Sequence, residues 1–96
     1  MADVRFTEAA LADLAHIYEW SEAEFGPEIA DVYMAKLKMN FDLLVRHPEA
    51  GMLRTDLRKP YRTLPCRSHR IFYAVDDQGV RIVRVLHAAM SAERIL

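Results

Sequence analysis

The second half of the sequence contains side chains that could hold a phosphate and move protons. His69 and His87 titrate near neutral pH, which suits a general acid or base. Arg62, Arg70 and Arg84 could hold a phosphate through forked hydrogen bonds. Together these residue types are compatible with the chemistry of nucleic-acid cleavage.

Cleavage of RNA without a metal needs a base for the 2′-hydroxyl, cations for the crowded phosphorane and an acid for the leaving oxygen. If the chain is a ribonuclease, its catalytic candidates are Arg62, Tyr73 and His87. Tyr73 could then stack on a base or donate a proton. This remains one of two hypotheses, because each of these residues also has a structural explanation.

The structural explanation is the more common one for isolated polar residues. A lone histidine such as His87, at the end of an apolar strand, is more often hydrogen-bonded structure than an acid or base. Cys66 and His69 are spaced like a thiol and its base, but no third group is placed to orient them. No spacing of His, Cys, Asp or Glu suggests a metal site, so we expect neither metal nor cofactor.

Charge is divided unevenly along the chain although the net charge is only −1. Residues 1–50 carry ten acidic and four basic side chains, whereas residues 51–96 carry nine basic and four acidic ones. Eight of those nine basic residues are arginines, which suit forked contacts with carboxylates or phosphates. The second half therefore favours an acidic partner or a nucleic acid, unless its charges balance the first half across the fold.

Composition restricts size and compartment. The chain has 96 residues, enough for one small domain spanning residues 1–96. It has a single cysteine, no apolar run long enough to cross a bilayer, and no signal-peptide pattern in residues 1–7. We therefore expect a cytoplasmic protein without membrane contact.

Apolar residues at helical spacing predict two helices, over residues 8–25 and 27–46. Thr7 suits the N-cap of the first, and its apolar stripe is predicted to run through Leu11, Leu14 and Tyr18, with Trp20 and Phe25 near its end. The second carries a core stripe that includes Tyr33, Leu37, Phe41 and Leu44, while Met39 falls on another side, either exposed or reserved for a partner. Gly26-Pro27 separates the two helices, and so short a link predicts an antiparallel hairpin.

Short alternating segments predict strands over residues 4–6, 61–64, 70–75 and 80–87, with a loop over 48–60. Residues 91–96 could form a last short helix or an extended arm. The order β-α-α-β-β-β predicts an α+β fold, in which the N-terminal helical hairpin packs on one face of a small antiparallel sheet. The other face is expected to be left to a partner or ligand.

Six sequence blocks in this order and spacing resemble the ParE branch of the ParE/RelE toxin superfamily, which has the same RelE-like fold. They are Phe6-Thr7-Glu8-Ala9-Ala10 with its following helix, Glu24-Phe25-Gly26-Pro27-Glu28, His47-Pro48-Glu49-Ala50-Gly51, Tyr61-Arg62, Ser68-His69-Arg70-Ile71-Phe72-Tyr73 and Ile82-Val83-Arg84-Val85-Leu86-His87. The blocks cover nearly the whole chain.

The resemblance implies a toxin of a type II toxin–antitoxin system. Such a toxin inhibits DNA gyrase and is neutralised in a hetero-oligomer with a ParD-like antitoxin. For contacts with antitoxin or target we expect Arg62, Arg70, Arg84 and His87, and no sequence-specific binding of nucleic acid. An acidic antitoxin tail that folds onto the hairpin and the sheet edge would complement the basic half of the chain.

Two alternatives remain open. RelE-like relatives cut messenger RNA on the ribosome, but they combine a Lys- and Arg-rich site with functional residues near the C-terminus, whereas here no tyrosine follows Tyr73. In addition, Ala88, Ala89 and Met90 stand where ParE members often carry a more polar stretch. The second alternative is therefore a member that binds antitoxin without being toxic.

Overall fold

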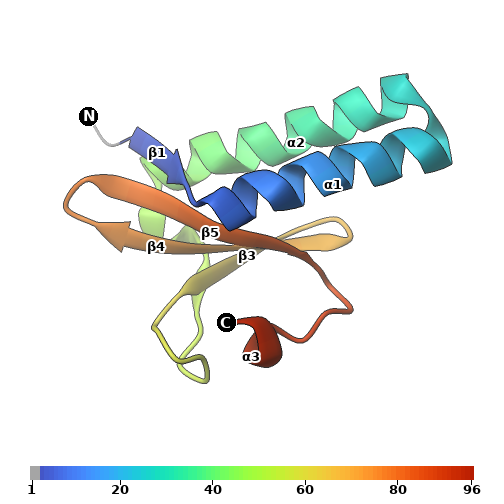
Figure 1. Cartoon of the computed structure of the whole chain (residues 1–96). Coiled ribbons are helices and arrows are strands. Elements are labelled where there is room, and N and C mark those ends of the chain that lie inside the picture. Colours follow the sequence, from blue (N-terminus) through green and yellow to red (C-terminus); the bar gives the residue numbers. More distant parts are fainter. Residues whose placement is uncertain (1–2) are drawn as a thin grey trace.

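A sheet of five strands lies between two helical layers in the computed structural model, which describes residues 3–96 (Figure 1). The strands are β1 (Asp3–Phe6), β2 (Met52–Leu53), β3 (Arg62–Cys66), β4 (His69–Asp76) and β5 (Gly79–His87), in the order β1-β5-β4-β3-β2. The expected absence of a signal peptide falls partly on residues 1 and 2, which lie outside the described residues.

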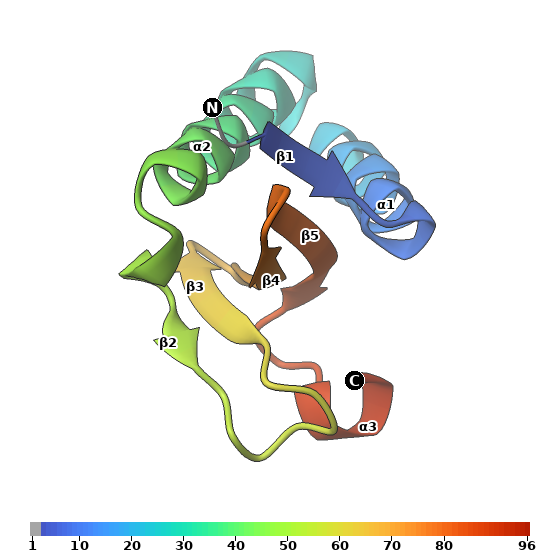
Figure 2. The ribbon, with the colours of Figure 1, turned by 90° about the vertical axis from the view of Figure 1, so that its left-hand side faces the viewer.

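The helical hairpin forms where the sequence predicts it. Helix α1 (Glu8–Phe25) is capped by Thr7, whose hydroxyl accepts a hydrogen bond of 3.0 Å from the Ala10 N–H. Gly26, at φ 90°, adopts a backbone conformation that favours glycine, and Pro27 opens helix α2 (Pro27–Arg46). Both helices pack on the same face of the sheet (Figures 1 and 2).

The buried face of α1 differs from the predicted one. Its buried residues are Ala10, Ile17 and Ser21, whereas Leu11 is exposed and Tyr18 is only half-buried. The small side chains of Ala10 and Ser21 let the helix approach its neighbours closely. A prediction from the spacing of large apolar side chains does not detect such positions. As a result α1 leaves large apolar side chains, among them Trp20 and Phe25, exposed at its surface.

The main core lies between the hairpin and the sheet. Leu37, Phe41 and Leu44 of α2 are buried against strands β4 and β5. The strand residues that meet them are Ile71, Tyr73, Val80, Ile82 and Val85. The α+β fold with a helical hairpin on one sheet face is thus confirmed.

Two features of the sheet were not predicted. Strand β1 pairs in parallel with β5, so the sheet is mixed rather than antiparallel throughout. The expected loop 48–60 begins with a 3₁₀ turn at Pro48–Ala50 and the two-residue edge strand β2, which pairs with β3. Pairing across distant segments, which local sequence patterns do not encode, decides both features.

The face of the sheet away from the hairpin is partly covered, which corrects the expectation that it is open. Phe72 and Leu86 are buried there by Leu57 of the 54–61 loop and Ala92 of helix α3 (Ala92–Ile95). Figure 1 shows α3 on the side of the sheet opposite to α1 and α2. Of the two predicted alternatives for residues 91–96, the short helix is therefore correct.

Candidate functional site

A groove runs along α2, between that helix, the end of α1 and the turn that joins β3 to β4. Two adjoining cavities of about 380 and 450 Å³ make up the groove. They share two lining residues, Lys36 of α2 and Arg67 of the β3–β4 turn. Volumes of this size are typical of binding sites.

One cavity is mainly apolar and exposes large side chains to solvent. Phe25, Ile29 and Val32 are each more than half exposed, at 53%, 53% and 56%. Trp20 stacks edge-on against Phe25, with ring centroids 5.7 Å apart. A cluster of exposed aromatic and aliphatic side chains around one cavity is typical of an interaction surface, whereas single exposed apolar residues occur on any protein surface.

The other cavity continues along α2 and is more basic. Met39, which is 69% exposed, and Leu43 lie beside Lys36, Arg46 and Arg67. Ile29, Val32, Lys36, Met39 and Leu43 follow one another at spacings of three or four residues, so they form a single stripe on α2 beside its core stripe. The prediction that Met39 lies on another side than the core residues is confirmed.

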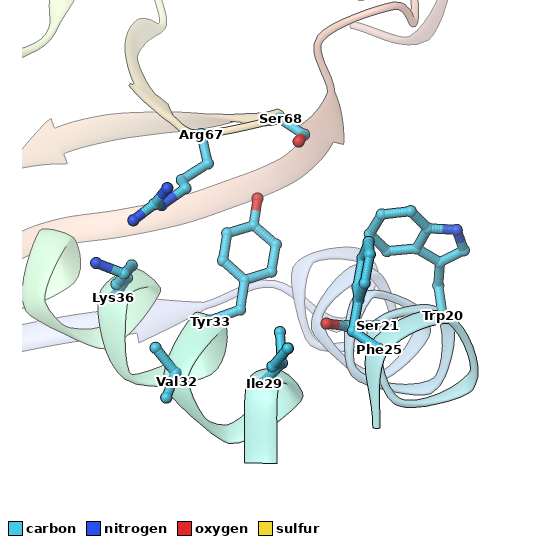
Figure 3. A pocket seen from close by; sticks show the side chains of 9 residues that line it. All are labelled: Trp20, Ser21, Phe25, Ile29, Val32, Tyr33, Lys36, Arg67 and Ser68. Carbon is cyan, nitrogen blue, oxygen red and sulfur yellow. The ribbon is translucent and has the colours of Figure 1, made fainter. Parts of the chain in front are cut away.

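The β3–β4 turn places Arg67 over the groove. Arg67 has φ 54°, a left-handed conformation that is strained for a non-glycine residue. Figure 3 shows its guanidinium extending toward Lys36, with Tyr33 beneath the turn. None of the ion pairs among residues 3–96 includes Lys36 or Arg67.

A hydrogen-bonded cluster holds the turn against α2. The Tyr33 hydroxyl donates to the Cys66 carbonyl at 3.2 Å and lies 2.6 Å from Nδ1 of His69. A hydroxyl has one hydrogen, so both contacts are satisfied when His69 Nδ1 carries a hydrogen and donates to Tyr33. Burial lowers the pKa of His69 and raises that of the Tyr33 hydroxyl, so both groups are neutral at pH 7.

Of the three predicted ribonuclease residues, Arg62 and Tyr73 are cross-strand partners that both contact Gly51, whereas His87 lies apart from them. Tyr73 is fully buried; its hydroxyl donates to the Pro48 carbonyl at 2.6 Å and accepts from the Gly51 N–H at 2.8 Å. Arg62 donates to the Gly51 carbonyl at 2.7 Å. His87 is the cross-strand partner of His69, and His69 lies four residues before Tyr73 on β4. His87 is therefore about 13 Å from Tyr73 along the strand direction.

The residues predicted to contact antitoxin or target do not form one patch: Arg84 and His87 line the same cleft, whereas Arg62 and Arg70 do not line it. Arg84 is engaged internally, because its Nε and Nη2 donate to the Asp13 carboxylate at 2.7 and 2.8 Å. His87 Nδ1 accepts from the Ala89 N–H at 3.0 Å and so supports the turn after β5. Arg70 is exposed and pairs with Leu86 in the sheet, at a distance from the groove.

A second cleft, of about 590 Å³, lies between α1 and the end of β5. It brings together Trp20, His16, His87 and Met90 with the Asp13–Arg84 ion pair. Because Asp13 already neutralises Arg84, this cleft offers less free positive charge than the groove along α2. The groove is therefore the stronger candidate site.

Reasoning from the sequence missed most of the groove. Lys36 and Arg67 belong to different elements, and nothing in the spacing of residues 36 and 67 indicates that they meet. The available signal was the second apolar stripe on α2, of which only Met39 was noticed. Among the described residues, no group of three His, Cys, Asp or Glu side chains could hold a metal ion, and neither long helix contains a stretch apolar enough to span a membrane.

Comparisons with known proteins agree with the resemblance. The model of the family described as "ParE toxin of type II toxin-antitoxin system, parDE" matches residues 4–92. Toxin ParE1 of Caulobacter vibrioides is 37% identical over 92 residues, which are 96% of this chain and 95% of the relative. Toxin ParE1 of Mycobacterium tuberculosis is 34% identical over 89 residues, which are 92% of this chain and 91% of the relative.

A solved structure supports the fold. A chain from the chromosomal ParDE system of P. aeruginosa superposes with a TM-score of 0.76 at 24% identity, covering 91% of this chain and 96% of that one.

Proposed function

The chain belongs to the ParE toxin family of type II toxin–antitoxin systems, and we propose that it is neutralised by a ParD-like antitoxin bound along α2 and inhibits DNA gyrase when free. Both activities are binding activities and need no catalytic residue. Since gyrase acts on DNA in the cytoplasm, we also propose that the toxin is a cytoplasmic protein.

The groove along α2 is the observation that supports antitoxin binding. It exposes Phe25, Ile29 and Val32 next to Lys36 and Arg67, two cations that are in no ion pair with any residue of the described range 3–96. An amphipathic helix with an apolar face and acidic side chains complements such a surface. The part of α2 from Ile29 to Arg46 spans eighteen residues, about 26 Å, and so offers space for several helical turns of a partner.

Coupled folding explains why the groove suits an antitoxin tail. A disordered tail loses conformational entropy when it folds, and burial of apolar surface must offset that loss. The toxin supplies the surface at Trp20, Phe25, Ile29 and Val32, which its own core leaves exposed. Charge attraction by the basic residues then accelerates association and favours acidic tails.

Matched valine variants test the groove. Val32→Glu places a carboxylate in the apolar cavity, whereas Val75→Glu does the same at an exposed position at the end of β4, outside the groove. We expect Val32→Glu to weaken antitoxin binding by at least about tenfold, since a charge would be desolvated on binding, and Val75→Glu to leave it unchanged. Calorimetry with the antitoxin encoded beside the toxin gene measures both. Equal affinities for the two variants would place the antitoxin elsewhere.

The gyrase proposal rests on family membership and is tested separately. After induction without antitoxin, DNA synthesis should fall before protein synthesis, and purified toxin should trap gyrase in complexes with cleaved DNA. An earlier fall in protein synthesis, together with cut messages, would instead favour the ribonuclease. Absence of growth arrest would favour the non-toxic alternative.

The arrangement of the predicted catalytic residues supports binding over RNA cleavage. The Tyr73 hydroxyl is buried with both its donor and its acceptor function in use. Arg62 lies beside Tyr73 and is held by the Gly51 carbonyl, whereas His87 lies apart from both, so the acid, base and cation of a nuclease do not all meet at one centre.

A further inference from the structure

We propose that Lys36 and Arg67 form a clamp for one carboxylate of the antitoxin, and that this contact sets the register of the antitoxin helix in the groove. The inference rests on the proposed binding of an antitoxin along α2. It adds the chemistry of the partner: an acidic side chain that follows, along the same helix face, the apolar side chains buried at the Phe25 end.

The position of the two cations supports a clamp. Lys36 and Arg67 are shared by the apolar cavity and the basic one, so they stand where the two halves of the groove meet. They approach from opposite walls, Lys36 from α2 and Arg67 from the β3–β4 turn (Figure 3). A side chain that passes between the walls meets both at once.

Among residues 3–96, neither of the two cations is in an ion pair. Three arginines of this described range are in ion pairs: Arg5 with Asp76, Arg54 with Asp56 and Glu93, and Arg84 with Asp13. No such partner reaches Lys36 or Arg67 among the ion pairs of residues 3–96. Two like charges that face one groove repel each other, and a carboxylate between them relieves this repulsion while it gains charge-assisted hydrogen bonds.

The backbone at Arg67 gives a second reason to assign it a binding role. Its φ of 54° suits glycine, asparagine or aspartate better than arginine. Arginine therefore occupies this turn at a conformational cost that a smaller residue would avoid. The backbone conformation does not favour arginine at position 67, so we attribute the choice of arginine to its long side chain, which extends over the groove.

The spacing along α2 defines the partner. Ile29 and Lys36 are seven residues apart, about 10 Å along the helix axis. An antitoxin helix lying along α2 therefore needs its acidic side chain about two turns from its apolar anchor, on the same face. A shift of one turn would place the carboxylate against Val32 or Met39 and leave it unpaired, which is how the clamp fixes the register.

The test uses variants that preserve the fold. Arg67→Gly removes the guanidinium and suits the left-handed turn, and Lys36→Met keeps an unbranched stem of similar length. Arg58→Gly and Lys59→Met are the controls, since both residues are exposed in the 54–61 loop, outside the groove. Affinity for the full-length antitoxin encoded beside the toxin gene is measured by calorimetry at low and high salt.

We expect each clamp variant to lose about tenfold or more in affinity and to show a weaker salt dependence, while the controls match the wild type. Because Lys36 and Arg67 hold the same carboxylate, the fold-loss of affinity in the double variant should be smaller than the product of the two single fold-losses. Among antitoxin variants with Asp→Asn or Glu→Gln changes, one should weaken binding to the wild-type toxin but not to the double variant.

The other outcomes overturn the clamp in distinguishable ways. If Arg67→Gly and Lys36→Met bind the antitoxin as tightly as the wild type while Val32→Glu binds it more weakly, the antitoxin docks in the groove but the clamp does not exist. Fully multiplicative losses would show two independent contacts. If Lys36→Met and Arg67→Gly keep their affinity for the antitoxin but lose binding to DNA or RNA oligonucleotides that the wild type binds, the two cations belong to a nucleic-acid site. If the wild-type toxin binds no antitoxin, the proposed function itself fails.

Discussion

Several residues of catalytic type carry out structural roles in this protein. Tyr73 joins the start of the 48–60 segment to β4, and Arg84 fastens α1 to β5 through Asp13. His69 is buried against Tyr33 and lies edge-on to His87, with ring centroids 5.3 Å apart. Buried polar groups must be hydrogen-bonded, and in a small domain these requirements are met by the same residue types that enzymes use for chemistry.

At this scale we predict that stability depends on pH through His69. Burial lowers the pKa of His69, the nearby His87 acts in the same direction, and Asp13 opposes them. The unfolded chain therefore holds the proton more tightly than the folded one. The contribution of His69 to stability is fully present above its ordinary pKa of about 6.5 and is lost as the pH falls from there toward the folded pKa.

Chemical denaturation at several pH values checks this prediction. We expect the free energy of unfolding of the wild type to decrease below about pH 6.5. The decrease should be smaller in His69→Gln, whereas the exposed control His47→Gln should follow the wild type. Parallel curves for His69→Gln and the wild type would assign the pH dependence to other groups.

Among the elements, α1 has a second task besides covering the sheet. Pairing of β1 with β5 ends at Ile82, so the rest of β5 would be an open edge. Side chains of the α1 region take over the pairing: the Thr7 hydroxyl donates to the Val83 carbonyl at 2.7 Å, and Asp13 accepts from the Val85 N–H at 2.9 Å. The helix therefore satisfies the backbone groups that the short first strand leaves unpaired.

We predict that Asp13→Ala lowers the free energy of unfolding by about 2 kcal/mol, because it leaves both Arg84 and the Val85 N–H without an acceptor. Asp13→Asn keeps an acceptor for the N–H and should lose less. Glu19→Ala, an exposed acidic position on the same helix, is the control and should change stability by less than about 0.5 kcal/mol. Equal losses for positions 13 and 19 would contradict the proposed role.

On the scale of the whole molecule, the sheet is covered on both faces but to different degrees. The hairpin covers one face with two long helices. Within residues 3–96, the other face is covered by the 54–61 loop and the α3 segment, which Arg54 links through its contacts with Asp56 and Glu93. The apolar surface on that face is thus covered by few residues, and these are held together by an ion pair at the protein surface.

Removal of residues 91–96 should expose Phe72 and Leu86, increase the binding of a hydrophobic dye and lower the melting temperature. Glu93→Ala removes the ion pair with Arg54 and the hydrogen bond that the Ser91 hydroxyl donates to Glu93, and it should cost less than about 1 kcal/mol, since Glu93 is largely exposed. A truncated protein with unchanged melting temperature and dye binding would show that α3 is not needed as a cover.

The two helices, their junction at Gly26-Pro27, the three long strands and the family could all be predicted from the sequence, because they follow from short-range periodicity, capping residues and consecutive motifs. The tertiary structure alone decided the parallel pairing of β1, the edge strand β2 and the covered far face.

The same division applies to the site. Met39 was identifiable from helical spacing, but Lys36 and Arg67 become neighbours only when the β3–β4 turn folds over α2. Arg62, Tyr73 and Arg84 had suitable chemistry, yet the fold uses them for internal hydrogen bonds. Local patterns encode which face of an element is apolar. Which polar groups remain free for a partner depends on contacts between residues far apart in the chain.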